Sequence, residues 1–88
     1  MKEITRENVL DIINSIQGLN VTLDQCDDNM FEKGLDSIKF IQVIVLFEKK
    51  FNCKVPDECL MFDEMNTVNK MTYVFNSLLA KNHDIFNH

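Results

Sequence analysis

The chain has 88 residues, of which 45% are hydrophobic, and its formal net charge is −5. This length favours one domain, and we expect residues 1–88 to form it, with a folded core over about residues 5–81. The acidic balance argues against a nucleic-acid partner, because binding a phosphate backbone needs clustered Lys and Arg.

The apolar residues do not gather into a targeting or membrane-spanning segment. No hydrophobic region follows Met1, and the longest uninterrupted apolar run, residues 43–47, is far too short to cross a bilayer. Cys26, Cys53 and Cys59 are odd in number and lack Cys-x-x-Cys spacing, and both histidines lie in the tail. We therefore expect a cytoplasmic protein with reduced thiols and no metal site, and the role of the cysteines stays open.

A first helix is expected to begin after Thr5, which can cap it, with Glu7 in its first turn. Apolar residues then recur at helical spacing and form one stripe: Val9, Ile12, Ile13 and Ile16. Gly18 follows this stripe and is expected at the C′ position, where the backbone is often left-handed.

A long connection without a sustained hydrophobic period follows over residues 19–35. Its apolar residues can pin it to the core: Leu23, Met30, Phe31 and Leu35. Its end is acidic, with only Lys33 to offset Asp24, Asp27, Asp28, Glu32 and Asp36. Loops of this length are often functional, and this one would steer a basic partner toward the residues that follow it.

The second helix is predicted over residues 37–51 and is apolar on more than one face. A buried stripe is expected from Ile41, Ile44, Phe47 and Phe51, widened by Phe40 and Val43. Ile38 and Val45 lie with Gln42 toward a second side. Such a helix is central in its bundle or partly exposed for a partner, and we expect both, the alternative for Val45 being full burial.

Pro56 prevents a helix from continuing through the residue before it, and Asp57 or Glu58 can begin a short third helix. Thr67 is expected to cap the last helix, whose apolar stripe is Val68, Met71, Val74, Phe75, Leu78 and Leu79. Residues 82–88 are expected to fray. The predicted fold is all-α: a small four-helix bundle with a long loop between helices one and two and a short third helix.

Ser37 stands where the long loop ends and the second helix begins. Asp36 is a good N-cap, Gly34 lets the backbone turn tightly, and the positive end of the helix dipole would favour a phosphate diester on the serine. The pattern fits a phosphorylated or phosphopantetheinylated serine, although Asp-Ser before an apolar run is more often only a helix cap. A catalytic nucleophile would need a base, and since no His lies outside the tail we do not expect an enzyme.

Four motifs, in register along the chain, resemble those of acyl and peptidyl carrier proteins. Residues 34–38, GLDSI, resemble the family's Gly-x-Asp-Ser-Leu box, with Ile38 in place of Leu. Residues 46–51, LFEKKF, resemble the end of the family's second helix, and residues 55–58, VPDE, resemble the turn that follows it. Residues 66–68, NTV, resemble the start of the family's last helix, so the resemblance extends over nearly the whole chain.

The resemblance implies a covalent 4′-phosphopantetheine arm on Ser37, which holds an acyl or aminoacyl group as a thioester. The domain itself would perform no chemistry. The implied partners are a phosphopantetheinyl transferase, a loading enzyme (adenylating or acyltransferase), and downstream condensing, modifying or thioesterase enzymes, all met by a monomeric carrier. Around the arm, Asp36, Ile38 and Val45 are the candidate recognition residues.

The charges of the second helix bear on the pathway. The family's fatty-acid carriers present a run of carboxylates there, whereas this chain has Lys39, Gln42, Glu48, Lys49 and Lys50. We therefore expect a stand-alone carrier in a nonribosomal peptide, polyketide-like or aminoacyl pathway. The alternatives are a fatty-acid-synthesis carrier and an interaction module that keeps the fold but takes no arm, and the cargo stays open between acyl and aminoacyl.

Overall fold

The computed structural model describes residues 3–56 and 61–86, with side chains up to Ala80. Its α-helices over these ranges are α1 (Arg6–Asn14), α2 (Ser37–Phe51) and α3 (Val68–Phe86). Short 3-10 helices lie between them: η1 (Leu23–Gln25), η2 (Met30–Lys33) and η4 (Phe62–Glu64). No strand occurs in this part of the chain, and the all-α prediction is confirmed.

The predicted short third helix falls largely outside the described residues. The sequence placed its start at Asp57 or Glu58, within residues 57–60, which the structure does not describe. Next along the chain comes η4, one turn of 3-10 helix over Phe62–Glu64 that leads into α3. The short segment is thus represented by η4 in the described part of the chain.

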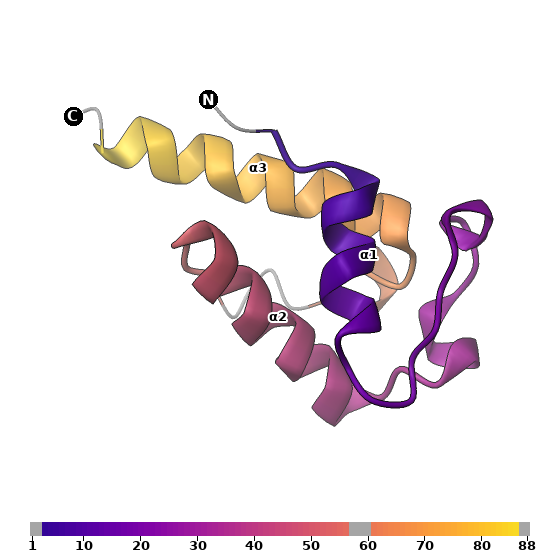
Figure 1. Cartoon of the computed structure of the whole chain (residues 1–88). Coiled ribbons are helices and arrows are strands. Elements are labelled where there is room, and N and C mark those ends of the chain that lie inside the picture. The colour runs from indigo at the N-terminus through magenta and orange to yellow at the C-terminus, as the bar shows by residue number, and fades with distance from the viewer. Residues whose placement is uncertain (1–2, 57–60, 87–88) are drawn as a thin grey trace.

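Helix α1 crosses α3 and contacts both of the other α-helices, while the long loop before α2 extends to one side of the bundle (Figure 1). The segment before α1 is clamped to α3 by a single side chain. Ile4 N donates to Asn76 Oδ1 at 2.7 Å, and Asn76 Nδ2 donates to Ile4 O at 2.8 Å. These two bonds join positions near opposite ends of the sequence.

Large side chains from all three α-helices form the core. The rings of Phe47 on α2 and Phe75 on α3 stack with their centroids 3.9 Å apart, and both side chains are fully buried. Other fully buried side chains are Ile4, Val9, Ile13, Met30, Phe40, Val43, Met65, Val68 and Met71. Burial of this apolar surface is the main force that holds so short a chain folded.

The structure corrects two members of the buried stripe predicted for α2, because Ile41 lies at the surface and Phe51 is only partly buried. The buried residues are Phe40, Val43, Ile44 and Phe47, whereas Ile41 is 48% exposed. At 100° per residue, Ile41 points about 100° away from Phe40 and toward the side that carries Ile38. Because α1 and α3 cover only the face around Phe40 and Phe47, Ile41 is left at the surface.

Helix α1 begins as the sequence predicted and ends earlier. Asn8 N donates to Thr5 Oγ1 at 3.2 Å and Thr5 N donates to Asn8 Oδ1 at 3.0 Å, a reciprocal capping box. The helix ends at Asn14 with Ser15 as its C-cap, so Gly18 is not the C′ residue. Gly18 instead has a φ of 93° in the turn that follows, where the backbone favours glycine.

Helix α3 begins where it was expected, because Lys70 N donates to Thr67 Oγ1 at 3.0 Å. Its stripe is buried at Val68, Met71, Phe75 and Leu78, and half-buried at Val74 and Leu79. The helix continues to Phe86, through most of the tail that the sequence predicted to fray. No helix in the described ranges is both long and apolar enough to span a membrane.

The long loop is fastened to the helices by backbone groups as well as by apolar side chains. The side-chain amide of Asn14 hydrogen-bonds both backbone polar groups of Val21. Its Oδ1 accepts from Val21 N at 2.7 Å, and its Nδ2 donates to Val21 O at 2.8 Å. Met30 N donates to the carbonyl of Asn66 at 2.7 Å, which ties η2 to the segment before α3. Met30 and Leu35 are buried, as expected, whereas Leu23 is 52% exposed and does not pin the loop.

Candidate functional site

Ser37 is the first residue of α2, and its side chain is exposed. The turn before it is made by Gly34, whose φ of 114° is a left-handed conformation that L side chains rarely adopt. The side chain of Leu35 is buried in the core, with only 3% of its surface exposed. This burial fixes the position of the backbone just before Asp36. The serine is therefore held at the surface by buried neighbours and not by contacts of its own.

Asp36 caps the helix as the sequence predicted. Its Oδ1 accepts from Lys39 N at 2.8 Å, and its backbone carbonyl accepts from Phe40 N at 2.7 Å. In the described part of the chain, the Ser37 hydroxyl has no hydrogen-bond partner. The amides of Ser37 and Ile38 precede the first intrahelical bond, so the positive end of the helix dipole lies beside this free hydroxyl.

An aromatic cluster beneath the site fixes the direction of α2. The buried ring of Phe40 meets the Phe62 ring edge-on at a centroid distance of 5.1 Å and lies 6.2 Å from the Phe31 ring. Phe31 and Phe62 also meet edge-on at 5.3 Å. The three rings join α2, η2 and η4, so the start of α2 is held from two sides.

The loop beside the site is acidic, as the sequence indicated, and its carboxylates are largely solvated. Lys33 Nζ lies 3.3 Å from Asp28 Oδ2, the ion pair found among the described residues. A hydrogen bond from the Thr22 hydroxyl lowers the pKa of the exposed Asp24 carboxyl. The surface before Ser37 thus carries an excess of acidic side chains, which would attract a basic partner.

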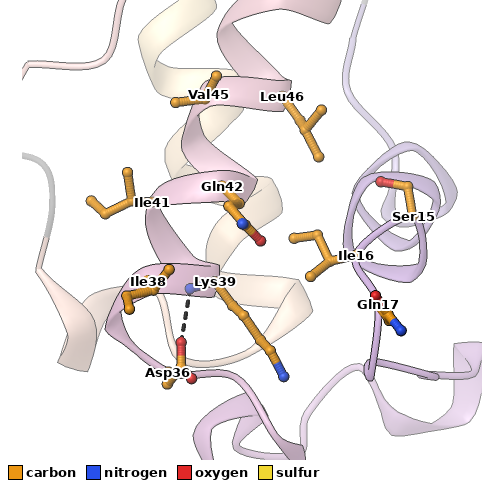
Figure 2. A pocket seen from close by; sticks show the side chains of 10 residues that line it. All are labelled: Ser15, Ile16, Gln17, Asp36, Ile38, Lys39, Ile41, Gln42, Val45 and Leu46. Carbon is orange, nitrogen blue, oxygen red and sulfur yellow. Dashed lines mark hydrogen bonds between the residues drawn. The ribbon is translucent and has the colours of Figure 1, made fainter.

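A groove of about 620 Å³ runs along α2 on the side that faces the end of α1 (Figure 2). We call it the α1–α2 groove, and its lining is Ser15, Ile16, Gln17, Asp36, Ile38, Lys39, Ile41, Gln42, Val45 and Leu46. Gln42 and Leu46 lie on the side of α2 toward Ile16, which follows the end of α1, while Ile38, Ile41 and Val45 lie on the opposite side of α2 (Figure 2). The groove begins at Asp36 and Ile38, the two neighbours of Ser37.

The structure brings together the four site residues that the sequence singled out. Asp36, Ser37 and Ile38 are consecutive and exposed, and Val45 lies further along the same helix with 39% of its surface exposed. Ile38 is 73% exposed, so the expected second apolar face of α2 is present. Full burial of Val45, the alternative, is wrong.

Sequence reasoning missed Ile41, Ile16 and Gln17 as parts of this surface. Ile41 could have been found, because it lies three residues after Ile38 and four before Val45, a spacing that shares one helix face. The role of Ile16 and Gln17 was not visible in the sequence, since it depends on how α1 packs against α2.

Lys39 closes the end of the α1–α2 groove nearest to Ser37. Its Nζ donates to the carbonyl of Gly34 at 3.3 Å and lies where a Cβ on Gly18 would approach it to 3.1 Å. This side chain therefore extends from α2 to the turns at Gly18 and Gly34, which lie at the two ends of the long loop. It also leaves a positive charge within the otherwise acidic region around Asp36.

The cysteines and acidic residues form no second centre in the described ranges. Cys26 and Cys53 are buried, and burial is the main factor that raises the pKa of the Cys26 thiol. Cys59 lies outside the described residues. No group of His, Cys, Asp and Glu side chains that could hold a metal ion occurs in the part of the chain that the structure describes.

Comparison with known proteins agrees with this geometry. A family model described as a phosphopantetheine attachment site matches residues 7–72. A D-alanyl carrier protein of Leuconostoc citreum is 39% identical over 76 residues, which cover 85% of this chain and 96% of the relative. A D-alanyl carrier protein of Lactobacillus acidophilus is 36% identical over 75 residues, covering 84% and 94%.

Among solved structures, the acetyl actinorhodin acyl carrier protein of Streptomyces coelicolor superposes with a TM-score of 0.61. The match covers 88% of this chain and 87% of that one at 18% sequence identity. The fold is therefore the all-α fold of acyl carrier proteins.

Proposed function

This chain belongs to the family of phosphopantetheine-binding carrier proteins, and from this premise we propose that Ser37 bears its covalent 4′-phosphopantetheine arm. One observation carries the assignment: Ser37 is an exposed hydroxyl without a partner in the described chain, at the first position of a capped helix. A phosphodiester on this oxygen would lie beside the free amides of Ser37 and Ile38 and the positive end of α2. The residues present thus fit the group.

The bound arm supplies a terminal thiol that holds an acyl or aminoacyl group as a thioester. The protein supplies the scaffold: Gly34 and Leu35 set the turn, and Asp36 caps the helix and accepts from Lys39 N. Because the serine sits on a rigid helix end, a flexible arm can sweep a defined volume of solvent and raise the local concentration of its cargo. Carrier proteins of this kind are generally non-catalytic, and partner enzymes act on the cargo.

We propose an aminoacyl cargo of the D-alanyl class, carried in the cytoplasm. Two relatives that align over almost their whole length are D-alanyl carrier proteins, which supports a small aminoacyl group over a fatty acyl or polyketide chain. The charges of α2 agree with this choice. Where a fatty-acid carrier presents a run of carboxylates, α2 has Lys39, Gln42, Glu48, Lys49 and Lys50, so its single carboxylate does not support an interface built on acidic helix residues.

Partner recognition is proposed for the apolar edge of α2 together with the cap residue. Ile38 and Val45 lie two helical turns apart on one side of the helix, and both are exposed. An apolar side chain left in water beside the arm can enter a pocket of an enzyme that must also admit the arm. Asp36 contributes a carboxylate at the point where the acidic loop meets this edge.

Two mass measurements test the proposal. The intact protein is incubated with coenzyme A, Mg²⁺ and a broad-specificity phosphopantetheinyl transferase, and a gain of one phosphopantetheine per chain is expected. The loaded protein is then offered D-alanine with ATP and an adenylating enzyme, or malonyl-coenzyme A with an acyltransferase. A thioester with D-alanine supports the aminoacyl assignment, and loading by the malonyl route alone would overturn it.

An unmodified mass in the first measurement would favour the remaining alternative, an interaction module that keeps the carrier fold and takes no arm. A folded control is needed, because an unfolded chain would also escape the transferase. Helical circular dichroism of the same sample provides it.

A further inference from the structure

Lys39 stands at a position where a helix does not favour a cation. It is the third residue of α2, beside the positive end of the helix dipole, whereas Lys49 and Lys50 lie in the last turn, where cations are favoured. The first turn of α2 has no acidic residue that would offset this charge. A departure from local preference of this kind is typical of a residue with a function, so its contacts outside the helix are informative.

Those contacts lie at the two ends of the long loop. Lys39 Nζ donates to the carbonyl of Gly34 at 3.3 Å, and a Cβ on Gly18 would lie 3.1 Å from the same nitrogen. The two glycines are also close to each other, since a Cβ on Gly34 would lie 3.6 Å from the carbonyl oxygen of Gly18. We call this meeting point of Gly18, Gly34 and Lys39 the loop neck, because the loop leaves and re-enters the bundle here.

The glycines allow this close approach. The chain has two glycines, and both lie in the loop neck. Each has a positive φ, 93° at Gly18 and 114° at Gly34, which other residues adopt only with strain. A side chain at Gly18 would also press on the Lys39 ammonium. The two glycines and the lysine therefore form a matched set.

Ion pairing does not explain the direction of the Lys39 side chain. Among the described residues the ion pair is that of Lys33 with Asp28, and Lys39 takes part in none. The neighbouring carboxylate of Asp36 accepts from the backbone N of Lys39. The ammonium group reaches past this carboxylate to a backbone carbonyl, so its contact is with the course of the loop.

The loop neck bears on the serine because the Gly34 carbonyl belongs to the peptide that begins the approach to it. Leu35 and Asp36 alone separate this peptide from Ser37. On its other side the same peptide is held through Leu35 N, which donates to Met30 O at 3.1 Å. We propose that Lys39 is a positioning residue for arm attachment, which acts through Gly34 to hold Ser37 in the arrangement that a transferase accepts. This inference rests on the function proposed above for Ser37.

The proposal predicts a specific kinetic effect. Without the Lys39 bond the turn at Gly34 has other arrangements open to it, and a transferase binds only the fraction of carrier molecules that present Ser37 correctly. A smaller competent fraction raises the apparent KM in proportion and leaves the kcat of the bound complex unchanged. The loss of one hydrogen bond corresponds to a change of about two- to tenfold in this KM.

Initial rates of arm attachment test this effect, with coenzyme A, Mg²⁺ and a broad-specificity transferase at varied carrier concentration. Lys39→Met keeps the length of the side chain and removes its donor, so the KM should rise by the stated factor at constant kcat. Lys39→Arg keeps a donor and should restore most of the wild-type KM. Lys33→Met is the control, because it removes a positive charge from the same acidic region without touching the loop neck, and its KM should not rise.

Hydrogen exchange of the free carrier, with no transferase present, tests the structural cause. In Lys39→Met the amides of Leu19 and Leu35, on either side of the loop neck, should exchange faster than in the wild type. The amide of Val21, which donates to Asn14 Oδ1, should not change. The melting temperature should stay within a few degrees of the wild type, because the lost bond is offset by removal of a cation from the first turn of α2.

The outcomes separate this inference from the proposed function. If intact mass shows no arm on the wild-type protein, the function proposed for Ser37 fails, and the inference falls with it. If the wild type accepts the arm and Lys39→Met has the same KM, only the inference fails.

Three further results would also overturn the inference alone. A raised KM without faster exchange at Leu35 would mean that Lys39 contacts the transferase directly. A large fall in the melting temperature of Lys39→Met would mean a general role in stability. An equal rise in KM for Lys33→Met would assign the effect to charge and not to the loop neck.

Discussion

At the residue scale, the behaviour of Ser37 depends on the three residues that precede it. Gly34 provides a left-handed turn, Leu35 is anchored in the core, and Asp36 caps α2 with a bond to Lys39 N of 2.8 Å. None of these interactions uses the serine hydroxyl. The hydroxyl can therefore be modified, or removed, without disturbing the helix that presents it.

The first prediction concerns this independence. Ser37→Ala should fold like the wild type and accept no arm, because the substitution removes one exposed oxygen that has no partner in the described chain. Intact mass after transferase treatment measures the loading, and circular dichroism measures the fold. Ser77→Ala, which removes another hydroxyl from a helix surface, is the matched control and should load fully. A loaded Ser37→Ala protein would refute the assignment.

The second prediction concerns recognition by a cognate loading enzyme. Ile38→Ala and Val45→Asp should each slow aminoacyl transfer while leaving the helical content intact, since both side chains are exposed on one edge of α2. Moderate salt should slow transfer only slightly, because this edge is apolar and the charges of α2 are mixed. Transfer rates at two salt concentrations measure both effects. A steep salt dependence with no effect of either variant would favour an electrostatic interface.

At the scale of the element, α2 combines a buried face with an exposed apolar edge. Phe40, Val43, Ile44 and Phe47 face α1 and α3, and Ile38, Ile41 and Val45 face solvent. Both sets are hydrophobic, so the amphipathic pattern that normally sets the orientation of a helix is weak here. The contacts of α1 and the aromatic cluster of Phe31, Phe40 and Phe62 determine which face is covered.

The third prediction compares two isoleucines of α2. Ile44→Ala should lower the free energy of unfolding by about 2–5 kcal/mol, because it removes a buried side chain and leaves a cavity. Ile41→Ala should change it by only about 0.5 kcal/mol, because Ile41 is 48% exposed. Urea unfolding of both variants and the wild type measures the difference. Equal losses in the two variants would mean that the buried face of α2 is assigned wrongly.

At the scale of the whole molecule, a few side-chain amides connect distant segments. Asn76 joins α3 to the backbone of Ile4, and Asn14 joins the end of α1 to Val21 in the long loop. Each amide both donates and accepts, so it satisfies two backbone groups at once. A small domain has a modest free energy of unfolding, so hydrogen bonds of this kind contribute a considerable share of it.

The fourth prediction tests the clamp between the ends of the chain. Asn76→Ala should lower the free energy of unfolding by about 1–3 kcal/mol, because the backbone N and O of Ile4 lose their partner while Ile4 is buried. Thermal unfolding measures the loss. Asn69→Ala, an amide on the same helix whose side chain bonds to Asp27 at an exposed site, should cost less and serves as the control. A smaller loss for Asn76→Ala than for Asn69→Ala would contradict this account.

Local chemistry in the sequence determined the helix starts, the fold class and the candidate site. Thr5, Asp36 and Thr67 cap α1, α2 and α3 as predicted, because a cap depends on a side chain and an amide three residues away. The bounds of α2 follow from the same cap and from an apolar run that ends at Phe51. The motif around Ser37 likewise lies within five consecutive residues, so its recognition required no knowledge of packing.

Tertiary structure alone decided which of several equally apolar faces is buried and what lies opposite the exposed one. Ile41 and Ile44 are the same residue type, yet one faces solvent and the other the core, because α1 and α3 reach only one side of α2. The α1–α2 groove arises in the same way, since Ile16 and Gln17 line it together with Gln42, which lies more than twenty positions later in the sequence. Burial is set by the neighbours that a residue meets in space, and a hydrophobic pattern on more than one face of a helix does not specify them.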